Sequence, residues 1–262
     1  AAVFGTPMAA AVFAMEVVSV GVMYYAALLP CVIASIIAAE FATGVGLNPE
    51  TFPVARIPQL SLESGLKMAV IAAGCGLLSI LFCVALKAVS GIYGKYLKNP
   101  YLRVCVAGCL VIGITMLLGT GDYMGAGNEL IAKAVEQGKA RPLDFLWKMI
   151  LTAITMRAGY RGGEIVPAFS VGATFGCVAG GLLGFSPEVA AAASMVALFC
   201  GVTNCPIASM LISFELFGFS GAAYYLIAIS ISYALSGYYS LYKDQTIVYS
   251  KYKARYINKK TH

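Results

Sequence analysis

The chain has 262 residues, of which 60% are hydrophobic and 11% are charged, and its net charge is +6. A soluble domain carries roughly a quarter charged residues, so this composition excludes an ordinary soluble domain and predicts an integral membrane protein. The basic residues gather near the end of the chain, at positions 243–260, and form no groove-like stripe, which argues against a nucleic-acid partner. Their position predicts a multi-pass protein of the cell membrane with a cytoplasmic C-terminus.

Apolar segments follow one another along the chain, separated by loops rich in glycine and proline. We expect residues 1–18 to close one transmembrane unit and residues 22–44 to form a second helix. Further helices are predicted at 62–97, 101–118, 128–138 and 143–157, and then in three apolar segments and a basic terminal helix. Because no segment alternates convincingly between polar and apolar residues, the predicted fold is an all-α polytopic membrane protein.

The sequence contains a repeated phrase. Residues 4–16 read FGTPMAAAVFAME and residues 203–215 read TNCPIASMLISFE, so that a proline opens each apolar stretch and a glutamate ends it. Two related halves with interrupted helices are typical of transporters. We therefore expect one transmembrane domain over 1–262, with 1–138 as the remainder of a first repeat and its linking helices, and 139–262 as a second repeat with a cytoplasmic terminal helix.

A glycine-rich phrase, RGGEIVPAF at positions 161–169, combines several features of an anion site. The two glycines let the backbone bend, and Pro167 suits the first turn of a helix, where its missing N–H costs nothing. The amides just before Pro167 then lie unpaired at the positive end of a helix dipole, which attracts anions. An ordinary tight connection between two helices is the alternative interpretation.

Three glutamates lie in or beside apolar segments. Glu164, within the glycine-rich phrase, is a candidate proton relay or a competitor of a bound anion, because a carboxylate at membrane depth is costly and usually functional; a solvent-facing loop residue is the alternative. Glu16 and Glu215 end the repeated phrases. Glu16 is a second proton-relay candidate, but for both we favour a structural role, binding nearby backbone amides.

The sequence lacks the residues that several classes of function require. The eight cysteines form no CxxC pair, and the single histidine is His262. A metal site or a histidine-based catalytic centre is therefore not expected, and without clustered acids neither is an enzyme. No phosphate-binding loop for ATP is present in the sequence, so the interpretation is transport without a cofactor.

The phrase GGEIVPAFSVGATFG, which begins at Gly162, resembles the G-G-x-F-x-P motif of the CLC family of chloride channels and anion/proton antiporters. The two repeated phrases resemble the matching helices of the family's inverted repeats, and residues 125–131 resemble its glycine-rich turn. The resemblance implies a CLC-like fold with broken helices. It also implies a homodimer in the lipid bilayer, with halide ions and sometimes protons as partners and a bound halide in place of a cofactor.

The resemblance further implies which residues hold the anion. These are the backbone at Gly163, Glu164 and Ile165, together with a tyrosine hydroxyl from the last helix. Tyr249 matches that tyrosine best, with Tyr242 and Tyr252 as rivals.

Two departures from the family pattern bear on the substrate. Val17 stands where exchangers often carry a second glutamate, which argues against the usual chloride/proton coupling. Glu164 is similar to the glutamate of a fluoride-exporting branch, although Val166 stands where that branch often has threonine. We therefore expect halide transport, with chloride favoured, a fluoride/proton antiporter as the alternative, and a non-conducting membrane partner chain as an alternative of another class.

The repeat also predicts a missing element. A first-half anion loop should lie as far before Pro7 as the glycine-rich phrase lies before Pro206. That position is upstream of residue 1, where the resemblance also places the gating glutamate. The N-terminal part of the fold is accordingly expected to be absent from this chain.

Overall fold

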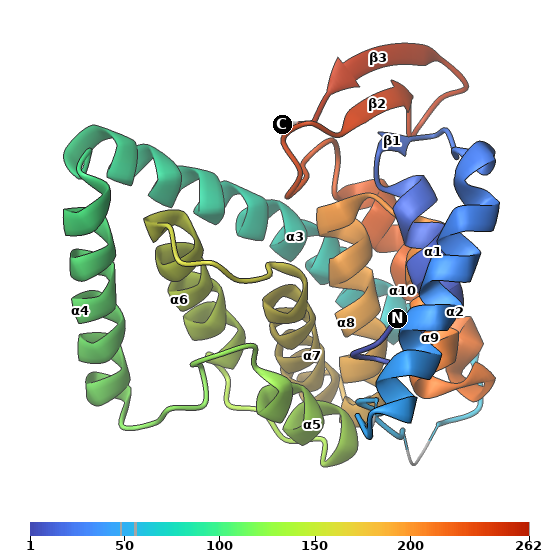
Figure 1. Cartoon of the computed structure of the whole chain (residues 1–262). Coiled ribbons are helices and arrows are strands. Elements are labelled where there is room, and N and C mark those ends of the chain that lie inside the picture. The colour runs from blue at the N-terminus through green and yellow to red at the C-terminus, as the bar shows by residue number, and fades with distance from the viewer. Residues whose placement is uncertain (48, 55–56, 262) are drawn as a thin grey trace.

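The computed structural model describes residues 1–47, 49–54 and 57–261, so His262 lies outside the described residues. Its architecture is mainly helical, as predicted (Figure 1). The helices are α1 (Pro7–Glu16), α2 (Leu28–Gly44), α3 (Leu62–Tyr96), α4 (Pro100–Leu118), α5 (Asn128–Glu136), α6 (Asp144–Ala158), α7 (Ile165–Leu182), α8 (Pro187–Thr203), α9 (Pro206–Phe217) and α10 (Ala222–Leu235). Short 3-10 turns, Tyr25–Ala27 and Phe219–Gly221, precede α2 and α10.

Among the described residues, four helical segments are long and apolar enough to cross a membrane: Tyr25–Gly44, Leu62–Tyr96, Pro100–Leu118 and Ile165–Leu182. Helix α3 has 35 residues and is therefore about 50 Å long, well beyond the hydrocarbon thickness of about 30 Å. Helices α2 and α4 bury little of their apolar surface within the chain. Such apolar, outward-facing helices suit contact with lipid or with another protein segment in the membrane.

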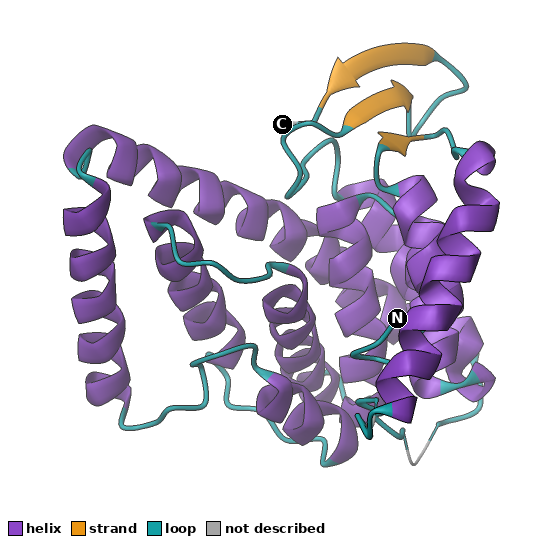
Figure 2. Ribbon diagram, in the orientation of Figure 1, coloured by secondary structure: helices purple, strands orange, loops and turns teal. Residues whose placement is uncertain are grey.

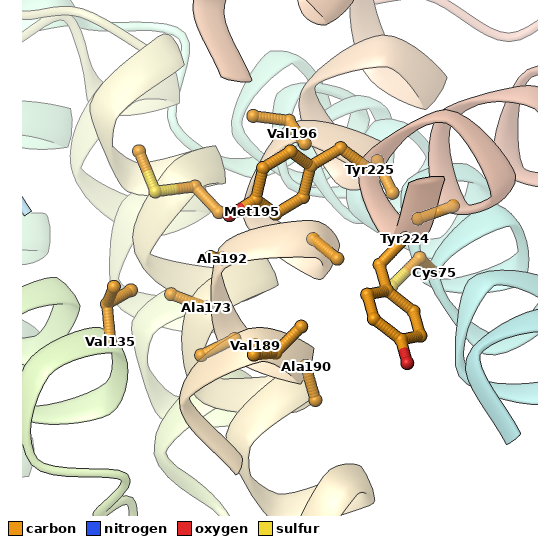
Figure 3. Packing of buried hydrophobic residues seen from close by; sticks show 14 of the residues in the cluster. Cys75, Val135, Ala173, Val189, Ala190, Ala192, Met195, Val196, Tyr224 and Tyr225 are labelled. Atoms are coloured by element: carbon orange, nitrogen blue, oxygen red, sulfur yellow. The ribbon is translucent and has the colours of Figure 1, made fainter. Parts of the chain in front are cut away.

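Helix α8 forms the centre of the core, between α7, α10 and α3. Every residue from Val189 to Thr203 is buried, and the buried side chains around the helix are mostly aromatic, alanine and isoleucine. Figure 3 shows part of this cluster, including Tyr224, Tyr225 and Ala173. The contact between α7 and α8 is close because small residues face each other there. A Cβ atom placed on Gly176 would lie 2.3 Å from the carbonyl oxygen of Ala190 and 2.4 Å from Cβ of Ser194.

A substitution at Gly176 tests the close contact between α7 and α8. We expect Gly176→Ala to destabilise the protein by about 1–3 kcal/mol, because the added methyl group overlaps backbone of α8 that has no room to move. Gly181→Ala on the same helix is the matched control, since a Cβ there meets nothing within 4 Å, and alanine favours helix. Thermal unfolding in detergent would measure both; equal stabilities for the two variants would contradict the described packing.

The repeated phrases pack against each other as α1 and α9. Both carboxylate oxygens of Glu16 accept hydrogen bonds from the first turn of α9, at 3.1 Å from the Ile207 amide and 2.8 Å from the Ala208 amide. Glu215 does the same for the first turn of α1, accepting from Met8 at 3.0 Å and Ala9 at 2.9 Å. The two helices are therefore antiparallel, and the structural role predicted for both glutamates is confirmed.

The predicted terminal helix is wrong. The end of the chain forms two strands, β2 (Thr246–Tyr249) and β3 (Tyr256–Lys260), and β2 also pairs in parallel with the two-residue β1 (Ser19–Val20) that follows α1. Figure 2 shows this small sheet at one end of the helical body. Basic charges do not set secondary structure, whereas Ile247, buried in the sheet, and its β-branched neighbours favour strand.

Candidate functional site

The glycine-rich phrase lies where α7 begins. Ile165 is the first helical residue and Pro167 falls in the first turn, as predicted. Glu164 precedes the helix, and its carbonyl accepts the amide of Ala168 at 3.2 Å. The amides of Ile165 and Val166 have no partner within the helix, because the first turn has no preceding carbonyls. These donors are free to bind an anion.

Glu164 is held by an arginine. Its Oε1 lies 2.8 Å from Nη2 of Arg157, in the last turn of α6, and both side chains are about four-fifths buried, with 20% and 21% exposure. This ion pair rules out the solvent-facing alternative for Glu164. The Nε atom of Arg157 is buried and has no hydrogen-bond partner among the described residues. The guanidinium therefore retains a donor that could serve an anion.

One face of the glycine-rich phrase borders a cavity of about 530 Å³. Gly163, Val166 and Pro167 contribute to its wall, together with residues of α4, of α6 and of the 123–126 turn. The cavity therefore reaches the unpaired end of α7. Other lining residues include Val111, Met124, Thr152, Thr155 and Tyr160.

A buried lysine, Lys148, lines the same cavity. Its side chain is almost fully buried, and its Nζ donates to the carbonyl oxygens of Tyr123 at 3.0 Å and Gly125 at 2.8 Å. No carboxylate pairs with it in the described part of the chain. Its positive charge is therefore uncompensated by the protein near the start of α7.

The glycine-rich turn before α5 holds this lysine. Gly125 and Gly127 both have positive φ, 65° and 96°, a conformation that favours glycine. A Cβ on Gly127 would lie 2.6 Å from Oγ of Ser170 and 2.8 Å from Cε of Lys148. The turn is thus pressed between α6 and α7, so the segment singled out in the sequence packs against the candidate site.

On the Arg157 side lies a second, smaller cavity of about 260 Å³. Its basic residues are Lys87 from α3, Arg157 from α6 and Lys243 from the loop after α10. The Arg157–Glu164 pair therefore joins this cavity to the start of α7.

A family model described as "Voltage gated chloride channel" matches residues 1–237. The chain belongs to this family. A chloride/fluoride channel protein of Pseudomonas syringae pv. tomato is 34% identical in an alignment that covers 96% of this chain and 57% of that protein. The H(+)/Cl(-) exchange transporter ClcA of Vibrio cholerae is 26% identical in an alignment that covers 82% of this chain and 49% of that protein.

Solved structures give the same fold. A crystal structure of a CLC-type fluoride/proton antiporter matches with a TM-score of 0.88 at 30% identity, covering 92% of this chain and 61% of the other. A eukaryotic CLC transporter, at 20% identity, matches with a TM-score of 0.66. The CLC fold predicted from the sequence is therefore confirmed. The chain spans about two-fifths to three-fifths of the length of these relatives.

The tyrosines of this chloride-channel family member are placed differently from the expectation. Tyr249 lies on β2, is 47% exposed and packs its ring against Tyr256 with the centroids 5.9 Å apart. It lines neither the larger nor the smaller cavity. Tyr252 does not line these cavities either. Its hydroxyl donates to the carbonyl of Ala234 at 2.7 Å.

Tyr242, by contrast, lies within the field of Glu164. Burial raises the pKa of Tyr242 to about 12, and negative charge on Cys205 and on Glu164 acts in the same direction. Its backbone amide donates to Oγ of Ser240, which lines the smaller cavity. Thr261, which also lines that cavity, donates from its Oγ1 to the carbonyl of Tyr242 at 2.9 Å, so Tyr242 is the candidate tyrosine whose backbone contacts the wall of the smaller cavity.

Neither Arg157 nor Lys148 was predicted from the sequence to be a site residue. Both lie in the apolar helix α6, and a basic residue in the last turn of a helix, such as Arg157, is common. Of the two, Lys148 was the easier to recognise in the sequence as a candidate, since it lies within the apolar part of α6. An ionisable side chain inside such a run is a functional candidate.

Proposed function

We propose that this chain forms part of a halide pathway through the cell membrane, with the anion held at the start of α7. The observation that carries the proposal is the position of Gly163, Glu164 and Ile165. They lead into a membrane-length helix beside a cavity, with unpaired amides at Ile165 and Val166 and with the Glu164 carboxylate held by Arg157. Halide transport in the names of the relatives supports the same function. The basic C-terminal strands would face the cytoplasm, and the protein would be a homodimer.

We favour fluoride over chloride as the substrate, for two reasons. The structure with a TM-score of 0.88 is a fluoride/proton antiporter, and the relative at 34% identity is a chloride/fluoride channel protein. Fluoride is small and strongly hydrated, so it needs strong donors to replace its water. Charge-assisted donors such as the Arg157 guanidinium are about twice as strong as neutral ones.

Proton coupling is assigned to Glu164 alone. Glu164 has a single ion-pair partner and lies next to the anion-binding amides. Both carboxylate oxygens of Glu16, in contrast, are occupied by the amides of α9. We therefore give Glu16 no proton step.

The experiment is halide efflux from liposomes that contain the full-length protein, with internal pH recorded. We expect fluoride efflux to exceed chloride efflux and to be accompanied by proton movement. Chloride efflux without fluoride efflux would overturn the fluoride assignment. Efflux of neither halide would overturn transport and would favour a non-conducting partner chain.

The tyrosine contact is best tested by a matched pair of variants. We expect Tyr242→Phe to raise the half-saturating halide concentration about tenfold to a hundredfold, because a hydrogen bond to a charged group contributes about 1.5–3 kcal/mol. Tyr249→Phe should leave it unchanged, since Tyr249 lies on an exposed part of the sheet. The same efflux assay measures both, and the opposite ranking would return the contact to Tyr249.

A further inference from the structure

The tyrosine segment, residues 239–245, carries Tyr242 and is anchored at the end of α8. The amide of Leu241 donates to the carbonyl of Val202, in the last turn of that helix, at 2.9 Å. Helix α7, which starts at the proposed anion-binding amides, packs closely along the same α8. The tyrosine and the amides therefore share one support, so the attachment of the segment to α8 determines where Tyr242 lies relative to the start of α7.

A single side chain, Asn204, holds both ends of the tyrosine segment. It ends α8 in the left-handed conformation, with φ of 59°, and is only 1% exposed. Its Nδ2 donates to the carbonyl of Tyr239 at 3.0 Å and to Oε1 of Gln245 at 3.0 Å. One carboxamide thus closes the segment into a loop, and Tyr242 is the middle residue of that loop.

The side chain of Gln245 extends this attachment to two further carbonyls. Its Nε2 donates to Thr203, the last residue of α8, at 2.7 Å and to Val17, just after α1, at 2.9 Å. Its Oε1 accepts from Asn204, so only one orientation of the Gln245 amide satisfies all of these contacts. A buried polar network in which every group has a partner favours a single rigid arrangement.

Lys251, in the turn between β2 and β3, sets the orientation of the Asn204 carboxamide. Its Nζ donates to Oδ1 of Asn204. It also donates to the carbonyl of Tyr233 at 3.2 Å and to Oγ of Ser236 at 3.0 Å, at the end of α10. Because an ammonium group can only donate, the carboxamide presents its oxygen to Lys251 and its nitrogen to the tyrosine segment.

We propose that Asn204, oriented by Lys251, is a positioning residue for Tyr242. It keeps the tyrosine at a fixed place relative to the start of α7, so that the hydroxyl and the amides act on the same anion. This inference rests on the proposed anion contact of Tyr242. The apparent affinity of a site falls with the fraction of molecules in which its groups are in place, so a loosened segment should weaken halide binding without slowing transport at saturation.

The first test is Asn204→Gly. Glycine suits the left-handed end of a helix, so α8 should stay folded while both hydrogen bonds to the tyrosine segment are lost. We expect the half-saturating concentration of the transported halide, fluoride or chloride, to rise about threefold to tenfold, with the maximal efflux rate within about twofold of the unaltered protein. Thr203→Val is the matched control, because the Thr203 hydroxyl donates within α8, to the carbonyl of Phe199 at 2.7 Å. An unchanged half-saturating concentration in Asn204→Gly would overturn the proposal.

A double-variant cycle separates positioning from a general loss of stability. In the Tyr242→Phe background no hydroxyl is left to position, so Asn204→Gly should change the half-saturating concentration by less than about twofold. A rise that persists in that background would mean that Asn204 acts independently of Tyr242, against the proposal. If Asn204→Gly does not fold, Asn204→Asp replaces it, since aspartate keeps the acceptor for Lys251 and lacks the amide donors. The same rise and the same dependence on Tyr242 are then expected.

Hydrogen exchange tests the attachment without transport. In the full-length protein in detergent, mass spectrometry of peptides covering 239–246 should show at least about fivefold faster exchange in Asn204→Gly than in Thr203→Val, with α7 unchanged. Equal exchange in the two variants would refute the proposal. Faster exchange in a protein that transports neither halide would overturn the proposed function and leave Asn204 as the residue that holds the tyrosine segment.

Discussion

Glu164→Gln is expected to retain halide efflux and to lose the proton movement that accompanies it, by at least about tenfold. Glutamine keeps the shape of the side chain and an oxygen that accepts from Arg157, but it cannot bind and release a proton. The ion pair at 2.8 Å would become a hydrogen bond from the charged guanidinium to a neutral amide oxygen, so the start of α7 should stay folded. Simultaneous recording of halide and pH in the liposome assay measures the two fluxes separately.

Glu63→Gln is the control for that variant. Glu63 is another glutamate paired with a basic residue, Lys67, at 2.7 Å, but it is 76% exposed at the start of α3. Its replacement removes the same charge and should change neither flux. Proton movement that persists in Glu164→Gln at the level of this control would assign the proton step to another residue.

The positions that could be predicted from the sequence are those with local causes. Pro167 is tolerated in the first turn of a helix but not in its interior, and so its position alone predicts where α7 begins. The repeated phrases predicted matching helices in two related halves for a similar reason, since each repeat carries its own proline and its own glutamate. The family and its fold followed from these two features in combination.

The residues that could not be predicted depend on contacts between distant elements. In the sequence, Arg157 looks like an ordinary basic residue at a helix C-terminus, where its positive charge interacts favourably with the helix dipole. Its ion pair with Glu164 forms because the chain turns at Gly159, with φ of 114°, and brings the glutamate back beside α6. The terminal strands depend in the same way on β1, because Ser19 and Val20 supply the backbone edge on which β2 pairs.

The second large effect is expected from the reciprocal glutamates, and it should be unequal in the two repeats. Glu16→Ala leaves two amides of α9 without acceptors, one of them buried, and should cost about 3 kcal/mol of unfolding free energy. Glu215→Ala should cost about 1 kcal/mol, because water can reach the more exposed amides of Met8 and Ala9. Thermal or denaturant unfolding in detergent would rank the variants.

Glu16→Gln completes this comparison. Glutamine keeps one acceptor oxygen and loses the charge that favours a helix N-terminus, so its cost should fall between that of Glu16→Ala and zero, at about 1 kcal/mol. Glu16 is buried, whereas Glu215 is only partly buried. Both glutamates make the same kind of contact, so the difference in unfolding free energy between Glu16→Ala and Glu215→Ala measures how much burial adds to the cost of losing that contact. Equal costs would mean that α1 and α9 depend on their caps to the same extent, whatever their exposure to water.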